Sequence, residues 1–288
     1  MASLKEIKSR IQSVKSTQKI TSAMKMVSSA KLRKAQKTIE NLFPYEQKLN
    51  GLLNNFLSAE EDNVSVYAET REVKRVAIVV FSSNSSLCGS FNTNVSKRLN
   101  DTIDKYRSLG VESILVYPVG KKVAKASRKK GFEPQNNFDS MADKPNYPAA
   151  MNFADDIMEL FKNKDIDRVE LIYHHFKSRS TQVLTEETFL PIQLKPAEKG
   201  VVALDYIVEP DRETIMSELI PKVLRLKIYT ALLDSSASEH AARTMAMQIA
   251  TDNATDLLQE LSLQYNKSRQ QAITNELLDI IGGSFGQN

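Results

Sequence analysis

The sequence predicts two long terminal helices that pair as an antiparallel coiled coil, with an open, Rossmann-like α/β domain inserted between them. Helix-spaced apolar residues run through both ends of the chain, and short β-branched runs alternate with helical segments in the middle. The 288 residues include no Trp, only 9 Gly and 26% charged residues, a composition that favours long helices. The expected domains are an N-terminal helix over 1–58, an α/β domain over 73–195 and a C-terminal helix over 208–286.

The N-terminal segment is expected to form one helix from Leu4 to about Leu57, with a bend near Pro44, which lacks a backbone N–H donor. Its apolar residues recur at intervals of three or four, then less regularly, which places them on one helix face. They are Leu4, Ile7, Ile11, Val14, Ile20, Met24, Val27 and Leu32.

The middle of the chain alternates predicted strands with predicted helices. The strands are expected at 75–83, 113–120 and 168–176, and the helices at about 92–109, 121–131 and 149–163. This alternation implies right-handed crossovers and a largely parallel sheet covered on both faces. Two further strands are expected at 181–192 and 200–210.

The C-terminal segment is expected to be helical from about Asp211 to Ile281, with a break or kink at Pro221. A helix this long cannot bury its own apolar face, so it needs the N-terminal helix as a partner. Small side chains at four-residue steps predict a close contact between the two helices. These are Ala242, Ala246, Ala250 and Ala254 on one helix and Ser9, Ser13, Thr17 and Thr21 on the other.

The two ends of the chain carry opposite charge. Residues 1–40 hold eight Lys and two Arg against two Glu, a balance of +8, whereas residues 211–288 hold seven basic and ten acidic side chains, a balance of −3. The N-terminal helix is therefore expected to face an acidic partner. The opening residues show no signal-peptide pattern and no apolar run is long enough for a membrane span, so no membrane anchor is expected.

No catalytic constellation is evident in the α/β domain. Cys88, the only cysteine, has no histidine near it in sequence and is expected to be a buried structural thiol. His174 and His175 are adjacent on a predicted strand, so they point to opposite faces and cannot chelate one metal ion. Gly120 and Lys121 lack the rest of a phosphate-loop motif and are expected to form a turn and a solvated charge.

Four segments resemble the gamma subunit of the rotary F-type ATP synthase, in the order of that family and across essentially the whole chain. They are 7–36 (IKSRIQSVKSTQKITSAMKMVSSAKLRKAQ), 86–92 (SLCGSFN), 239–254 (EHAARTMAMQIATDNA) and 265–283 (YNKSRQQAITNELLDIIGG). The last fits the I-T-x-E-x-x-[DE] pattern of the family. The chain departs from the family at Ser284, where Ala is usual, and at Asn84, Ser85 and Ser86, where D-R-G is common.

The resemblance implies a non-catalytic rotor subunit. In this family the paired helices form a shaft inside a hexamer of alternating alpha and beta subunits, and the α/β domain forms a foot on the membrane rotor ring. An epsilon-type accessory subunit also binds the foot. ATP and Mg²⁺ belong to the partner subunits, so no cofactor is expected in this chain. Membrane association, at the cytoplasmic face of the bacterial inner membrane, is expected only through the complex.

The resemblance also implies partner-binding residues. Basic residues of the N-terminal helix would face acidic segments of beta, and two methionines would supply adaptable contacts. These are Lys8, Arg10, Lys19, Met24, Lys25, Met26 and Arg33. Gln270, Thr274 and Glu276 would lie at the same level of the shaft, with Glu276 paired to Lys25. Tyr206 and Glu209 would contact the rotor ring.

Two other classes of function are considered. A basic coiled coil could bind nucleic acid through residues 1–40, but the small-residue stripes favour a helix partner instead. A nucleotide-binding enzyme built on the α/β domain would need a phosphate loop, which the sequence lacks.

Overall fold

The computed structural model of the chain describes residues 3–58, 65–192, 209 and 211–285. Its internal contacts divide the chain into two units. Unit 1 comprises Met1–Ser28 and Thr244–Asn288, and unit 2 comprises Ser29–Arg243. Helices α1 (Leu4–Ser58) and α6 (Arg212–Phe285) contribute residues to both units.

Unit 2 is built on a four-stranded sheet in the order β2-β1-β3-β4. Strand β1 (Val76–Phe81) pairs in parallel with β2 (Ile114–Val119) and with β3 (Arg168–Phe176), as the sequence predicted. Strand β4 (Gln182–Leu190), within the predicted 181–192 segment, runs antiparallel to β3 at the sheet edge. The predicted strand at 200–210 lies outside the described residues, apart from Glu209.

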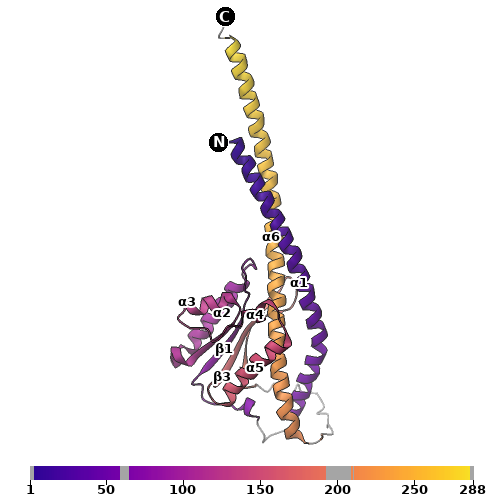
Figure 1. Cartoon of the computed structure of the whole chain (residues 1–288), viewed down its shortest axis with the longest axis vertical. Helices are drawn as coiled ribbons and strands as arrows, with labels where there is room; N and C mark the ends of the chain where they lie inside the picture. Colours follow the sequence, from indigo (N-terminus) through magenta and orange to yellow (C-terminus); the bar gives the residue numbers. More distant parts are fainter. Residues whose placement is uncertain (1–2, 59–64, 193–208, 210, 286–288) are drawn as a thin grey trace. The chain divides into compact units, whose positions relative to one another are not determined.

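Helices cover both faces of the sheet (Figure 1). Alternate side chains of β1 enter two separate cores, because successive residues of a strand point to opposite faces. Val76, Ile78 and Val80 pack with α2 (Phe91–Tyr106) and α3 (Lys121–Lys129). Ala77, Val79 and Phe81 pack with α5 (Tyr147–Lys162) and with parts of α1 and α6.

Short helices complete unit 2. The sequence did not predict α4 (Asp139–Asp143), which buries Met141 against the second of these cores. Three 3₁₀ turns lie in the connections: η1 (Val66–Ala68), η2 (Arg107–Leu109) and η3 (Val111–Ser113).

Neither internal proline ends its helix. Helix α1 continues through Pro44, and α6 begins at Arg212 and continues through Pro221, so the expected break at Pro221 does not occur. A proline inside a helix removes one backbone hydrogen bond. At Pro221 the neighbouring Leu219 and Ile220 are buried in the core, and their burial offsets that loss.

Unit 1 is an antiparallel pair formed by the start of α1 and the later part of α6. Three side-chain contacts define its register. Gln18 donates to Thr255 at 2.8 Å, the hydroxyls of Thr21 and Thr251 lie 2.8 Å apart, and the Lys25 ammonium donates to the Gln248 side-chain carbonyl at 2.5 Å.

The contact face of each helix recurs alternately every four and three residues. This average of 3.5 residues is the period of a left-handed coiled coil. The buried or half-buried positions that follow this spacing are Ile7, Ile11, Val14, Gln18, Thr21, Lys25 and Ser28 on α1, and Met247, Thr251, Ala254, Leu258, Leu261 and Tyr265 on α6.

The predicted small-residue stripes form only part of the contact face. Ser9, Ser13 and Thr17 are exposed, whereas Thr21 is buried. On α6 only Ala254 of the stripe is buried, and Ala242, Ala246 and Ala250 are half-buried. A step of four residues advances about 400° around a helix of 3.6 residues per turn, so a four-residue stripe drifts away from a 3.5-residue seam.

Candidate partner-binding surfaces

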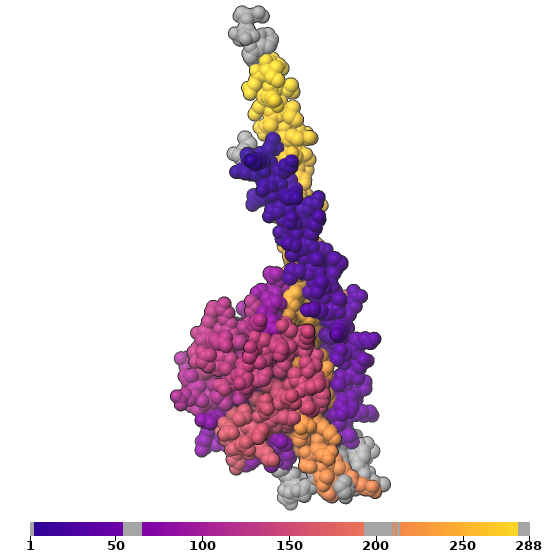
Figure 2. Space-filling model, viewed as in Figure 1, coloured from indigo at the N-terminus to yellow at the C-terminus, as the bar shows by residue number. Residues whose placement is uncertain are grey.

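Among the described residues of unit 1, the C-terminal end of α6 has no helix partner. In the observed register, residue numbers that face each other add to about 273, so the start of α1 at Leu4 lies opposite residues near 269. Every side chain from 269 to 281 is exposed. Figures 1 and 2 show this yellow end of α6 continuing past the indigo start of α1.

Five large apolar side chains lie on this end of α6. Their exposed fractions run from 49% to 63%, far above those of core residues. They are Ile273, Leu277, Leu278, Ile280 and Ile281. A contiguous apolar surface of this kind indicates a site that a partner covers.

The predicted motif residues Gln270, Thr274 and Glu276 lie on this same uncovered end, and all three are exposed. The predicted ion pair between Glu276 and Lys25 is wrong, because Lys25 contacts Gln248 instead. Residue 276 lies beyond the start of α1, so no α1 residue faces it in the register. Lys25 and the motif residues Gln270, Thr274 and Glu276 therefore lie at different levels along unit 1.

Four of the five basic residues predicted on α1 are exposed and available to a partner. Lys8, Arg10 and Lys19 of unit 1 and Arg33 of unit 2 are exposed, and none forms an ion pair with the carboxylates of the described residues. Unpaired surface cations attract an acidic partner surface and steer its approach.

The sequence reasoning missed an apolar outer face on α1. Ile20 and Val27 were placed in the buried stripe, but they are 60% and 58% exposed. The seam positions next to them are Thr21 and Ser28, which are buried. Met26 is 63% exposed and Met24 is half-buried. The signal in the sequence was the four-three spacing continued from Val14, which selects Thr21 and Ser28 rather than their apolar neighbours.

The described residues include only one of the two residues predicted to contact the rotor ring. Glu209 is exposed, and Tyr206 lies outside the described residues. Contact of either with a ring stays a prediction.

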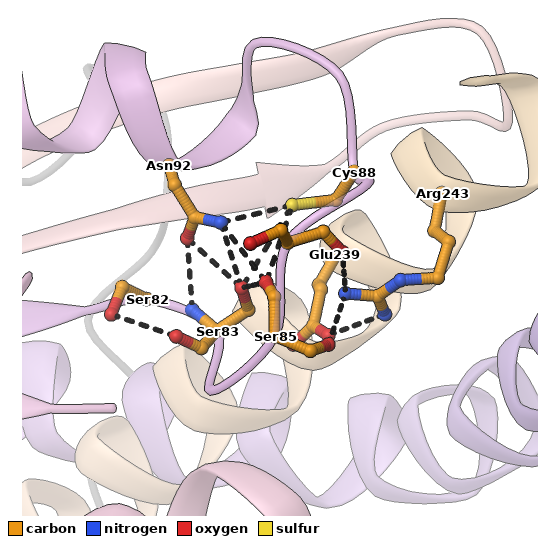
Figure 3. Close-up of polar contacts among 8 residues, drawn as sticks. Ser82, Ser83, Ser85, Cys88, Asn92, Glu239 and Arg243 are labelled. Atoms are coloured by element: carbon orange, nitrogen blue, oxygen red, sulfur yellow. Dashed lines mark hydrogen bonds and ion pairs between the residues drawn. The ribbon is translucent and has the colours of Figure 1, made fainter. Parts of the chain in front are cut away.

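The loop that follows β1 is held by a buried polar network in unit 2 (Figure 3). The Asn92 amide donates to the Ser83 hydroxyl at 2.8 Å and to Cys88 Sγ at 3.0 Å. Cys88 is 1% exposed, which confirms the prediction of a buried thiol. The network fixes the loop as a structural element.

Arg243 of α6 joins this loop to the helix (Figure 3). Its guanidinium donates to Glu239 Oε1 at 2.6 Å, to Ser85 Oγ at 2.7 Å and to the Ser86 carbonyl at 3.3 Å. Burial raises the pKa of Glu239, and the charge and hydrogen bond of Arg243 oppose that rise. Ser85, at a position where the resembling family commonly has Arg, thus serves as an acceptor for a buried cation.

The described residues contain no group of three His, Cys, Asp or Glu arranged to hold a metal ion. His174 is buried and stacks on Phe91 at 4.4 Å between ring centroids, and burial lowers its pKa to about 4. His175 is exposed on the other face of β3, as predicted, and contacts Asp234 at 2.5 Å. Gly120 begins α3 with φ of 110°, where a Cβ would lie 2.5 Å from the Ser82 carbonyl oxygen, so the predicted turn is confirmed.

None of the described helices combines the length and hydropathy needed to cross a membrane. Three exposed surfaces are suited to partners: the uncovered end of α6, the unpaired cations of α1 and the apolar outer face of α1.

Comparisons with known proteins agree with one another. The sequence model of a family described as ATP synthase matches residues 3–285. The chain is 62% identical to the ATP synthase gamma chain of Phocaeicola vulgatus, covering 99% of this chain and 100% of that one, and 59% identical to that of Bacteroides thetaiotaomicron, with the same coverage.

Solved structures are similar as well. A chain from the central stalk and c-ring of Tetrahymena thermophila mitochondrial ATP synthase has a TM-score of 0.60 and 25% identity, covering 80% of this chain and 99% of that one. A chain from Euglena gracilis mitochondrial ATP synthase has a TM-score of 0.66 and 20% identity, covering 98% and 94%, and shares the fold. The chain belongs to the ATP synthase gamma chain family.

Proposed function

We propose that this chain is the central-stalk rotor subunit of an F-type ATP synthase and transmits torque between a proton- or sodium-driven membrane ring and the catalytic hexamer. The observation that carries the proposal is the uncovered end of α6, where every side chain from 269 to 281 is exposed and five large apolar ones are among them. An alpha/beta hexamer would cover this end. The named relatives and the central-stalk structure support the assignment.

The chain itself is non-catalytic, and ATP and Mg²⁺ bind to the partner subunits. A coiled coil of two unlike helices has no threefold symmetry, so each of three beta subunits meets a different side of it. If the orientation of the stalk biases the conformations of beta, nucleotide turnover at beta must bias the orientation of the stalk to the same extent.

The unpaired cations of α1 suit acidic segments of beta, and Met24 and Met26 suit a contact that changes during rotation. Glu209 and Tyr206 are assigned to the contact with the membrane ring, where an epsilon-type accessory subunit also binds. The chain is thereby peripheral to the cytoplasmic face of the bacterial inner membrane, held there through the complex. A nucleic-acid partner has no support among the relatives.

Single-molecule rotation tests the proposal. A bead is attached to Lys130→Cys, an exposed position in unit 2, and the chain is assembled with its alpha and beta subunits; the natural Cys88 is buried and does not compete for the label. ATP should drive continuous one-way rotation of the bead. An assembled complex that hydrolyses ATP while the bead only fluctuates would contradict the rotor function.

A further inference from the structure

A cavity of about 430 Å³ lies in unit 2 between α1, the turn after α4 and α6. Its floor includes Leu233 and Ser236 of α6, which are 4% and 8% exposed. Lys31 and Lys34 from α1 and Lys144 from the turn after α4 also line it. Residues far apart in the sequence thus meet around one recess.

The charges around this cavity are unbalanced. Three lysines face one carboxylate, Asp143, which leaves a net charge of +2 on the lining. None of the three lysines forms an ion pair with another described residue. Other cations of unit 2 do pair with carboxylates: Lys105 with Glu170 and Glu186, Lys227 with Glu187, and Arg225 with Asp155. The cavity therefore gathers three lysines without ion pairs around one recess.

His240 also lines the cavity, from α6, and its pKa responds to the charges around it. Burial and, to a smaller extent, the positive charges of Arg243 and Lys31 together lower the pKa of His240 to about 4. The imidazole is thus neutral at physiological pH. An anion in the cavity would favour the protonated imidazole and so raise its pKa.

We propose that this cavity binds a small multivalent inorganic oxyanion of the phosphate class. The ammonium groups of Lys31, Lys34 and Lys144 contact the anion, and the Ser236 hydroxyl offers a hydrogen-bond donor at the floor. The lining carries a net charge of +2 and its three lysines are exposed, so its attraction for an anion rises with the charge of that anion. Leu233 and Pro145 add apolar surface to the lining, so the site is a recess open to solvent rather than a flat basic face.

Lysine acetylation of the full-length chain, read by mass spectrometry at submicromolar protein concentration, tests this proposal with inorganic pyrophosphate as the probe. A bound anion holds the ammonium groups protonated and screened. Millimolar pyrophosphate should therefore slow acetylation of Lys31, Lys34 and Lys144 together by about threefold or more. Lys37 of the same helix and Lys130, both exposed and outside the cavity, should react as before.

Two variants sharpen the result. Lys31→Gln with Lys34→Gln should abolish protection of Lys144, whereas Lys37→Gln should leave it intact. With isotopically labelled histidine, the pKa of His240 should rise on addition of pyrophosphate, while His174 and His175 serve as internal references.

Sodium chloride at matched ionic strength and a hexaglutamate peptide complete the test. Equal slowing by sodium chloride would mean general screening and would overturn the proposal. Protection by hexaglutamate without protection by pyrophosphate would make the cavity a docking surface for an acidic protein segment, which also overturns it.

Discussion

Arg243 and Glu239 form a buried ion pair on α6, with Nη1 of Arg243 2.6 Å from Oε1 of Glu239 and side-chain exposures of 8% and 10%. The same guanidinium holds the loop after β1 through Ser85 and Ser86. A buried pair of this kind costs desolvation free energy, and its value to the fold depends on both partners being present.

Arg243→Met should strongly destabilise unit 2. The substitution leaves Glu239 buried without its cation and releases the loop contacts, so the free energy of unfolding should fall by about 3–5 kcal/mol. Chemical denaturation of the full chain measures this loss. Adding Glu239→Gln to Arg243→Met removes the unpaired charge and should restore more than half of it. A double variant no more stable than the single one would show that the loop contacts, not the charge, are decisive.

The loss of unfolding free energy caused by Arg243→Met should become smaller as the pH falls. Burial raises the pKa of Glu239 above 4.5, and removal of Arg243 takes away the group that opposes the rise. A carboxyl with a raised folded-state pKa is most favourable to the fold when protonated, and that contribution is lost as the pH rises through the folded pKa. Denaturation midpoints of variant and parent should therefore converge from pH 8 toward about pH 5, and a gap that stays constant would contradict this account.

His174 should make the fold less stable in acid. Its folded pKa of about 4 lies below the ordinary value of 6.5, so the unfolded chain binds more protons between these values. Neutral, buried His174 makes its full contribution to the free energy of unfolding above pH 6.5. That contribution, about 3 kcal/mol, is lost as the pH falls toward 4. His174→Gln should flatten the dependence of unfolding free energy on pH in this window. His240 has a similar folded pKa, so part of the slope should persist.

The register of unit 1 can be tested by cross-linking. The hydroxyls of Thr21 and Thr251 lie 2.8 Å apart, so Thr21→Cys with Thr251→Cys should form a disulfide under mild oxidation. Lys25→Cys with Glu276→Cys should not, because Lys25 lies opposite Gln248. Gel mobility before and after reduction gives the answer, and efficient cross-linking of the second pair would overturn the register.

Ala254 should tolerate a larger side chain less well than an exposed position does. It is 7% exposed within the seam, so Ala254→Leu adds bulk where the helices approach and should cost about 1–3 kcal/mol. Gln259→Leu on the exposed face should be nearly neutral, because both residues favour helix. In the assembled complex, coupled ATP synthesis should fall for Ala254→Leu before expression does. Equal effects at both positions would mean that Ala254 does not line a helix contact.

Local patterns in the sequence were enough to predict the main strands and the two long helices. The β-branched runs at 75–83, 113–120 and 168–176 predicted the three parallel strands, and the 3-4-3 spacing of Leu4, Ile7, Ile11 and Val14 predicted the paired helix. These patterns are local: the period of a strand or helix decides which side chains share a face, and burial of that face follows.

The tertiary structure decided which residues face which. The register of unit 1 depends on the sum of contacts along two helices, so no single stretch of sequence could show that Lys25 meets Gln248 rather than Glu276. The small drift between a four-residue step and a 3.5-residue period was enough to turn Ser9, Ser13 and Thr17 to solvent.

The arrangement of the polar sites depended on the tertiary structure even more than the register of the two helices did. Arg243 reaches Ser85 across 158 positions of the chain, and Lys31 and Lys144 meet around one cavity from different elements. Such groups share no periodicity and no spacing, because chain topology brings them together only after the sheet and its covering helices have packed. The sequence determined what could form helix and strand, and packing decided which charges were paired, which were buried and which were left for a partner.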